Sequence, residues 1–236
     1  MGRDILELII TRHGETWGNL PEEDRIKNGR QSDRESMLTE KGIKQAELLG
    51  ERLEIGEFDC IFASPLIRTI GTAYEVLKRQ KNQNLKIEIL PDLFEVGTKP
   101  GYMGYTAGEI IKMYPKVRVL PCTEEPTPAG GKLALGEEND EIIFERAKRC
   151  IKYFRKRFKN GESVLVVAHG TFNNYLIKAA LGIENNNQFY FSQENTALSK
   201  VRYLKTKKDS DCESKLAYLN DTTHLFKMDY ESAFHL

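Results

Sequence analysis

The sequence predicts an α/β domain in which helices cover both faces of a largely parallel sheet. Three short apolar runs carry this prediction: Ile5–Thr11, Phe58–Ala63 and Val164–Ala168. Each run is too short for a helix and indicates a buried strand. Each is also followed at once by residues that start a helix, and strands that alternate with helices along a chain favour a parallel sheet.

Helix signals follow the second and third runs. After the second run, Ser64 and Pro65 predict an N-cap and first helical residue, with a helix that continues to about Arg79. After the third run, the segment 169–171 predicts the start of a helix that ends at Gly182, because glycine is the residue that most readily closes a helix. The pattern therefore places a strand–helix junction after each run.

The remaining elements come from spacing alone. Apolar residues keep helical spacing in the segment that Thr39 caps, and again from Ile143 to Phe158. Further strands are predicted at Lys86–Leu90, Ala197–Thr206 and Lys215–Leu219, the last of them at a sheet edge. These elements extend the alternation of strands and helices over most of the chain.

One domain is expected over residues 1–236, since a chain of this length can bury a single sizeable core and contains no internal repeat. The exception is an inserted loop or lid around residues 97–136. Its second half, Pro115–Gly136, is rich in proline and glycine and shows little periodicity. Loops of this length are usually functional or mobile.

Composition excludes several classes of function. Lysine plus arginine equals aspartate plus glutamate, at 35 each, so no net charge attracts nucleic acid or an anionic membrane. The apolar runs are too short to span a bilayer. The four cysteines form no C-x-x-C pair and no zinc-ligand spacing, and we expect a reduced, cytoplasmic protein; they are Cys60, Cys122, Cys150 and Cys212. Any bound anion must therefore be held by a local cluster.

Polar side chains gather where the three runs end. Arg12 and His13 follow the first run, Arg68 follows the second, and His169 with Gly170 follows the third. Ligands of open α/β sheets bind beyond the carboxyl ends of the strands, beside helix N-termini that favour anions. If the three strands are neighbours, two arginines and two of the four histidines converge on one spot.

These residue types suit phosphoryl transfer. Arg12 and Arg68 can offer forked donors to the oxygens of a phosphoryl group. A neutral imidazole is a competent nucleophile at phosphorus, and nearby arginines favour the neutral form of His13. His169 can hydrogen-bond the same oxygens. Each residue taken singly is more often structural, so the joint occurrence carries the prediction.

Two further requirements of the reaction can be met. Gly14 and Gly170 would leave room for a phosphate to approach the backbone. A leaving alkoxide needs a proton, so a carboxylic acid should stand nearby. Glu95, just after the predicted strand Lys86–Leu90, is the candidate.

At this point the motifs resemble a known family, the histidine phosphatase superfamily of phosphoglycerate-mutase-like proteins. The resemblance covers about residues 5–225. It is carried by five ordered segments: Arg12–Thr16 with Asn19, Leu38–Gly42, Ser64–Thr69, Val166–Gly170 and Leu219–Leu225.

The resemblance implies a three-layer α/β/α sandwich around a mostly parallel sheet, and it implies roles for individual residues. His13 would be the phosphohistidine nucleophile, and Glu95 the proton donor. The phosphate pocket would be formed by Arg12, Arg68 and His169, with a further contact from Asn19. Glu15 and His224 match the family as supporting residues, which we interpret as structural. No metal and no cofactor is implied.

The expected function is hydrolysis of a small phosphorylated metabolite by a monomer or homodimer that binds neither nucleic acid nor membrane. The main alternative is a 2,3-bisphosphoglycerate-dependent phosphoglycerate mutase, but the mutase-type element after the acid is absent, since Glu95 is followed by Val96–Pro100. A non-catalytic binding protein on the same fold is a second alternative. A metallohydrolase is a third, although the sequence contains no H-x-H or H-x-x-x-H spacing.

Overall fold

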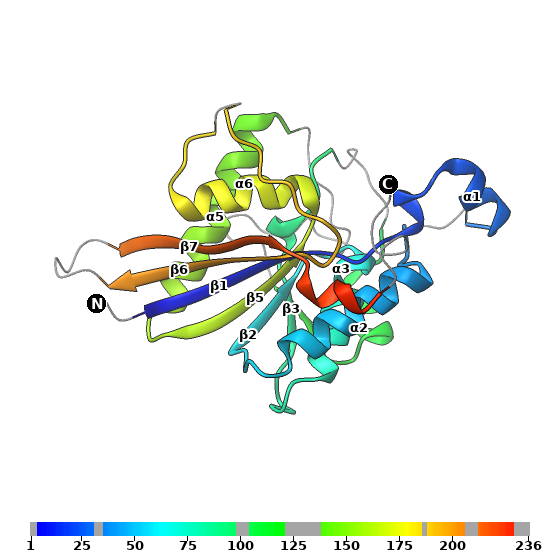
Figure 1. The fold of residues 1–236 in the computed structure, drawn as a ribbon, viewed down its shortest axis with the longest axis horizontal. Coiled ribbons are helices and arrows are strands. Elements are labelled where there is room, and N and C mark those ends of the chain that lie inside the picture. The colour runs from blue at the N-terminus through cyan, green and yellow to red at the C-terminus, as the bar shows by residue number, and fades with distance from the viewer. Residues whose placement is uncertain are drawn as a thin grey trace.

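We describe the protein from a computed structural model, which places residues 4–30, 35–97, 104–120, 138–185, 188–205 and 212–228. A seven-stranded sheet crosses the molecule, and Figure 1 shows helices on both of its sides. The strand order is β4-β3-β2-β5-β1-β6-β7. The bounds are β1 Asp4–Arg12, β2 Cys60–Ala63, β3 Ile87–Ile89, β4 Val117–Val119, β5 Glu162–Ala168, β6 Leu198–Lys205 and β7 Cys212–Asp221.

Five of the strands, β4 to β1 in the sheet order, pair in parallel. The last two, β6 and β7, join antiparallel at the β1 edge. Register within the parallel part aligns the strand ends, because Arg12 pairs with Ala168 and Ala63 pairs with Val167. The predicted α/β class with a mostly parallel sheet is confirmed.

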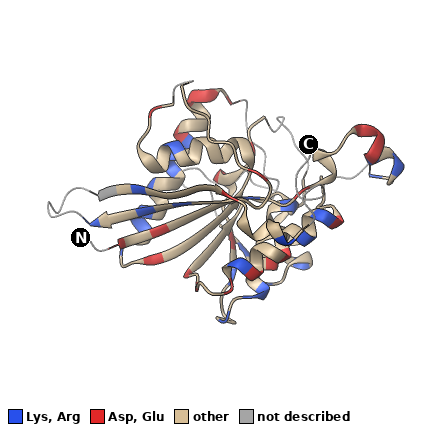
Figure 2. Cartoon of the chain, in the orientation of Figure 1, with Lys and Arg blue, Asp and Glu red and all other residues tan. Residues whose placement is uncertain are grey.

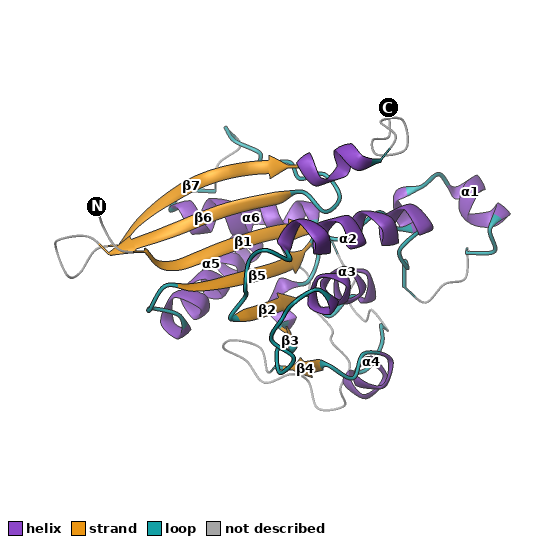
Figure 3. Ribbon diagram, turned by 60° about the horizontal axis from the view of Figure 1, so that its bottom comes forward, coloured by secondary structure: helices purple, strands orange, loops and turns teal. Residues whose placement is uncertain are grey.

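The helices form two layers. Figures 1 and 3 show α5 and α6 on one face of the sheet and α2 and α3 on the other. The bounds are α1 Glu22–Lys27, α2 Glu40–Leu53, α3 Ile67–Lys78, α4 Ala107–Met113, α5 Asp140–Arg157 and α6 Gly170–Leu181, with short 3-10 helices η1 Trp17–Asn19, η2 Pro91–Leu93 and η3 Thr223–Lys227.

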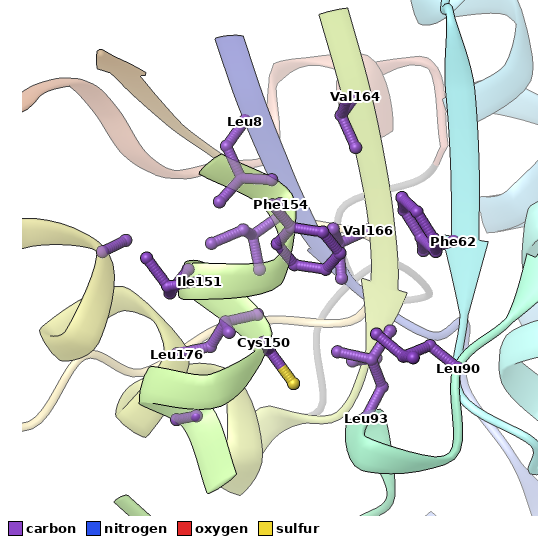
Figure 4. Packing of buried hydrophobic residues seen from close by; sticks show 14 of the residues in the cluster. Leu8, Phe62, Leu90, Leu93, Cys150, Ile151, Phe154, Val164, Val166 and Leu176 are labelled. Carbon is purple, nitrogen blue, oxygen red and sulfur yellow. The ribbon is translucent and has the colours of Figure 1, made fainter. Parts of the chain in front are cut away.

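Side-chain alternation along β5 explains the two layers. Val164 and Val166 point into the cluster that contains α5 and α6, whereas Leu165 and Val167 point into the cluster that contains α2 and α3. All four are fully buried. Successive side chains of a strand point to opposite faces, so a strand covered on both sides must be apolar throughout. Figure 4 shows the first cluster, where Phe154 of α5 packs against β1, β5 and β2.

The observed ends of three helices can be compared with the caps predicted from the sequence. Thr39 is the N-cap of α2, with its hydroxyl accepting from the Gly42 N–H, and Gly182 closes α6 at a φ of 69°. The N-cap prediction for Ser64 was wrong, because α3 starts two residues later with Leu66 as its N-cap. Ser64 follows β2 directly, and its hydroxyl is engaged by His169 instead.

The predicted long loop 115–136 contains a strand. Its first residues form β4, which adds to the sheet beside β3. A three-residue strand is too short to show any periodicity, which explains why the pattern missed it. Residues 98–103 and 121–137, which make up most of the predicted lid, lie outside the described residues. A single domain over residues 1–236 stays a prediction.

Charges of both signs are interspersed over the strands and helices that the structure describes (Figure 2). This distribution agrees with the equal numbers of acidic and basic residues. In the same described part of the chain, every helix is either too short or too polar to cross a membrane.

Candidate active site

The sheet register brings two imidazoles together. Arg12 and Ala168 are paired neighbours on β1 and β5, so the next residues, His13 and His169, leave the sheet side by side. The backbone N–H of His13 donates to the Ala168 carbonyl at 3.1 Å, and the centroids of the two imidazole rings lie 5.3 Å apart. The predicted convergence of the two histidines is therefore found.

The His13 ring is held in a single orientation. It is 4% exposed, and its Nδ1 lies 2.7 Å from the Gly14 carbonyl oxygen. A carbonyl only accepts, so Nδ1 carries the proton and Nε2 keeps its lone pair. Burial, together with the charges of Arg68 and Arg12, lowers the pKa of His13 well below its usual range. The ring is therefore neutral near pH 7 and can act as a nucleophile through Nε2.

His169 is held by a residue from the neighbouring strand. Its Nε2 lies 2.8 Å from the Ser64 hydroxyl, and Ser64 follows β2 as His169 follows β5. Its Nδ1 is buried without a hydrogen-bond partner among the described residues. Burial and the positive charge of Arg68 lower the pKa of His169 well below its usual range. A buried ring nitrogen without a partner is a contact point for a polar ligand.

Arg12 ends β1 next to the imidazoles. Its Nη1 donates to the Gln193 carbonyl at 3.1 Å, while its Nε is buried and has no partner in the described part of the chain. A Cβ at Gly170 would lie 3.3 Å from that Nε, so Gly170 makes room for the guanidinium. A phosphate contact at Gly170 stays a prediction.

Arg68 is the second residue of α3 and is tied to the nucleophile segment through Thr72. The Thr72 hydroxyl accepts from the Gly14 N–H at 3.0 Å and donates to the Arg68 carbonyl at 2.8 Å. Leu66 supplies no side-chain cap to α3, and the Ile67 N–H donates instead to the buried carboxylate of Glu35 at 2.6 Å. Arg68 therefore stands on a helix start that is fixed from two sides.

Glu95 follows η2, and its side chain reaches the first turn of α6. Its Oε1 accepts from the N–H groups of Val96 at 2.9 Å and Phe172 at 3.1 Å, and Phe172 is the third residue of the helix that His169 caps. Burial raises the pKa of the Glu95 carboxyl, against the opposing effect of these hydrogen bonds and the two arginines. The structure thus brings the predicted acid to the same helix terminus as the second imidazole.

Asn19 and Glu15 occupy the loop that follows His13. The exposed Asn19 side chain accepts at Oδ1 from the Thr16 N–H and hydroxyl, both at 2.9 Å, which leaves its Nδ2 group as the donor for a ligand. Glu15 is buried, accepts from the Thr39 hydroxyl at 2.8 Å and pairs with Lys41 at 3.1 Å. These contacts fit the structural interpretation of Glu15, whereas a phosphate contact from Asn19 stays a prediction.

Gly14 packs against the start of α2. A Cβ on Gly14 would lie 2.4 Å from the Gly42 carbonyl oxygen, so the glycine allows the segment after β1 to approach α2, and room for a phosphate beside it stays a prediction. His224 is buried with its Nε2 3.0 Å from the Thr196 hydroxyl, which fits a structural role.

Several residues at the site gave no signal in the sequence. Asn195 donates from Nδ2 to the His13 carbonyl at 2.8 Å, and Gln193 accepts from Arg12. They approach the site from a segment about 180 residues away along the chain. A polar run without periodicity is ordinary for a loop, so only the fold identifies these two residues.

The arrangement can bind a tetrahedral oxyanion. The charges of Arg12 and Arg68 act on both buried imidazoles at the start of α6, and donors of this kind favour anions. Among the described residues, no group of three His, Cys, Asp or Glu side chains could hold a metal ion. The fold and the site together define an α/β protein with two buried imidazoles of lowered pKa and two arginines whose charges act on both.

Comparison with known proteins agrees with this class. Residues 8–212 match the histidine phosphatase superfamily (branch 1), and the chain belongs to that family. It is 28% identical to phosphoserine phosphatase 1 of Hydrogenobacter thermophilus, over 84% of this chain and 86% of the relative. It is 24% identical to a 2,3-bisphosphoglycerate-dependent phosphoglycerate mutase of Chlamydia muridarum, over 69% of this chain and 78% of the relative.

Solved structures show the same fold. The alpha-ribazole phosphatase from Shigella flexneri superimposes with a TM-score of 0.58 at 21% identity, over 92% of this chain and 96% of that chain. The predicted family is thus confirmed. The family match and the relatives that are named phosphatases support a phosphatase activity.

Proposed function

We propose that this protein hydrolyses small phosphomonoesters in the cytoplasm through a phosphohistidine on His13, without a metal ion. The observation that carries the proposal is the state of the His13 ring. The ring is buried and neutral, its Nδ1–H is engaged by the Gly14 carbonyl, and its Nε2 lone pair is left for phosphorus. A histidine kept only for structure would have no need of two arginines and a second unprotonated imidazole beside it.

In the first step, Nε2 of His13 attacks phosphorus and the bond from phosphorus to the ester oxygen breaks. The leaving alkoxide takes a proton from Glu95, so the alcohol departs neutral. Arg12 and Arg68 stabilise the charge on the equatorial oxygens, with further donors from His169 and the Nδ2 group of Asn19.

In the second step, water attacks the phosphohistidine. Glu95, now a carboxylate, takes a proton from that water, and the phosphorus–nitrogen bond breaks. Inorganic phosphate and neutral His13 are released, which restores the starting state. One carboxyl group therefore serves first as the acid and then as the base.

The protonation states agree with these steps. Glu95 must start protonated, and its raised pKa keeps it so to a higher pH than an exposed glutamate. His13 must start neutral, and its lowered pKa keeps it so to a lower pH than an exposed histidine. Both groups are in their working forms on the acid side of neutral, where we place the optimum.

Mutase activity is the competing function, since relatives of both kinds match the chain. A mutase must retain a bisphosphate through turnover, which takes further cationic anchors and exclusion of water. The mutase-type element that should follow the acid is absent from residues 96–100. This departure from the mutase pattern favours hydrolysis.

The proposal is tested by measuring phosphate release from a phosphomonoester panel after treatment with a chelator. We expect full activity without metal, and a loss of about 10³-fold or more in His13→Ala, because removal of a nucleophile abolishes the covalent route. His224→Gln is the matched control, since it removes another buried imidazole and should keep most of the activity.

Three results would contradict the proposal. Retention of full activity in His13→Ala would remove the nucleophile assignment, and loss of activity in the chelator would indicate a metal-dependent reaction. Transfer dependent on 2,3-bisphosphoglycerate at a rate above hydrolysis would assign the chain to the mutases.

A further inference from the structure

A buried arginine on α5 makes an unusual set of contacts near the site. Arg146 is 2% exposed. Its Nε and Nη2 donate to the two carboxylate oxygens of Glu138 at 2.7 and 2.8 Å, which is the forked geometry of a strong ion pair. The charge of Arg146 is thereby balanced within the protein, and the remaining nitrogen is available for other partners.

That remaining nitrogen holds the backbone that leads into Glu95. Nη1 of Arg146 donates to the carbonyls of Asp92 and Phe94, each at 2.8 Å. The Phe94 carbonyl belongs to the peptide unit that supplies the Glu95 nitrogen, so one guanidinium fixes the chain immediately before the proposed acid. These partners are 54 and 52 residues away in the sequence, and the contact is made only by the fold.

The same guanidinium also touches the residue that binds the Glu95 carboxylate. Its central carbon lies 4.2 Å from the centroid of the Phe172 ring, in a cation–π contact. The Phe172 N–H donates to Glu95 Oε1 at 3.1 Å. Arg146 therefore contacts both the backbone before Glu95 and the residue that holds its carboxylate.

Neighbouring residues of α5 support the same segment. Arg149 lies 3.8 Å from an Asp92 carboxylate oxygen, and the Cys150 thiol donates to the Asp92 carbonyl at 3.7 Å. Figure 4 shows Leu90 and Leu93 beside Cys150, in the cluster on which α5 packs. The helix thus forms the support on which η2 and Glu95 rest.

Stability alone does not explain this arrangement. A buried ion pair is often no more stabilising than apolar residues of similar volume, because both charges must leave water. What the guanidinium adds is direction, since its fixed fork contacts one carboxylate, two carbonyls and one ring at once.

We propose that Arg146 is a positioning residue that holds the Glu95 carboxyl group at the start of α6, in place to protonate the leaving group. This inference rests on the proposed role of Glu95 as the acid. Arg146 itself contacts neither substrate nor the reacting atoms.

The test separates protonation of the leaving group from the rest of the reaction. Arg146→Lys is assayed with 2,4-dinitrophenyl phosphate, whose leaving group needs no proton, and with an alkyl phosphate, whose leaving group does. General acid catalysis contributes about 10²–10⁴-fold. The readout is kcat/KM, which reports the first step and not the later hydrolysis of the phosphohistidine, where Glu95 acts as the base for either substrate. We expect kcat/KM for the alkyl phosphate to fall by about 10–100-fold, as a misplaced acid loses part of that factor. The kcat/KM for the dinitrophenyl ester should stay within about threefold.

Two comparisons make the result specific. The control is Arg157→Lys, which lies on the same helix about 16 Å away along its axis. Arg157 also makes a forked ion pair, with Glu88, and its guanidinium stacks on the Phe62 and Phe158 rings. This variant should change kcat/KM little, and equally for the two substrates. Adding Arg146→Lys to Glu95→Gln should cause no further loss with the alkyl phosphate, because the acid that Arg146 positions is already absent.

A second variant keeps the test usable if Arg146→Lys does not fold. Phe172→Leu removes the ring under the guanidinium and keeps the N–H that binds Glu95, and it should give a smaller loss with the same selectivity. Equal losses on both substrates, or fully additive losses with Glu95→Gln, would overturn the inference. If Glu95→Gln itself shows no dependence on the leaving group, the proposed role of Glu95 fails; if it does and Arg146→Lys does not, only the role of Arg146 fails.

Discussion

The two ends of β1 both carry charge, and they use it differently. At the start of the strand, Asp4 and Glu7 pair with Arg202 and Lys200 of β6, and these side chains are partly exposed. Each charge there has a partner of opposite sign within the protein, in contact with solvent. Exposed pairs of this kind contribute little to stability, and they carry no chemistry.

At the end of the strand, the basic groups lie close to one another. Arg12 donates through Nη1 to the neutral Gln193 carbonyl, and its Nε is buried without a partner among the described residues. His13 and His169 are buried with pKa values lowered by burial. Position along the strand, and not charge content, therefore separates the site from the surface: the carboxyl end of β1 lies beside the start of α6, whereas the other end carries ion pairs with β6 in contact with solvent.

Substitution of one arginine at each end gives the largest expected effect. Arg12→Ala should lower kcat/KM for phosphomonoester hydrolysis by about 10²–10³-fold, since a buried donor to the developing charge is lost. Arg202→Ala should leave kcat/KM within about twofold, because its partners are carboxylates at the surface. Similar losses in the two variants would break the comparison, and thermal unfolding of both would exclude a difference in folding.

The pH dependence of the free energy of unfolding should show a smaller effect of the same buried groups. The pKa values of His13, His169 and His224 are lowered in the folded protein, the last to about 4. As the pH falls below about 6.5, the unfolded chain binds protons that the folded chain does not, so the free energy of unfolding falls by about 1.4 kcal/mol per pH unit for each histidine. Glu95, with its raised pKa, acts in the opposite direction, as one group against three.

Denaturant unfolding at several pH values between 7 and 5 measures the slope of the free energy of unfolding against pH. The double variant His13→Gln with His169→Gln should remove about two thirds of it, because two of the three imidazoles are gone. Inorganic phosphate should also reduce the slope in the unmodified protein, since a bound anion favours protonated imidazoles at the site. A slope that neither treatment changes would mean that the site histidines are not held neutral.

The sequence was sufficient for those parts of the fold and site that are written in contiguous segments. His13, Arg68 and His169 each lie within five residues of the end of an apolar run, so a strand end and a reactive side chain are visible together. Strand order was not visible, and neither was the register that aligns Arg12 with Ala168, because pairing depends on contacts between distant segments.

The errors have the same origin. Ser64 has the chemistry of an N-cap, but a neighbouring strand delivers His169 to its hydroxyl and the helix starts two residues later. The close approach of Gly14 to the start of α2 gave no signal either, because it joins two segments that are separate in the sequence. Arg146 gave no signal at all, because an arginine within an amphipathic helix is ordinarily exposed and only tertiary structure shows that it is buried.

Direct detection of phosphate on His13 tests the central claim. Glu95→Gln should be mixed with 2,4-dinitrophenyl phosphate, whose departure needs no acid while hydrolysis of the intermediate still needs the base, and then quenched with alkali for mass spectrometry. We predict one phosphate on His13, stable in alkali and lost in acid, and none when His13→Ala is added. Phosphate on a different residue, or turnover of the ester with no phosphorylated protein at any time, would contradict the account.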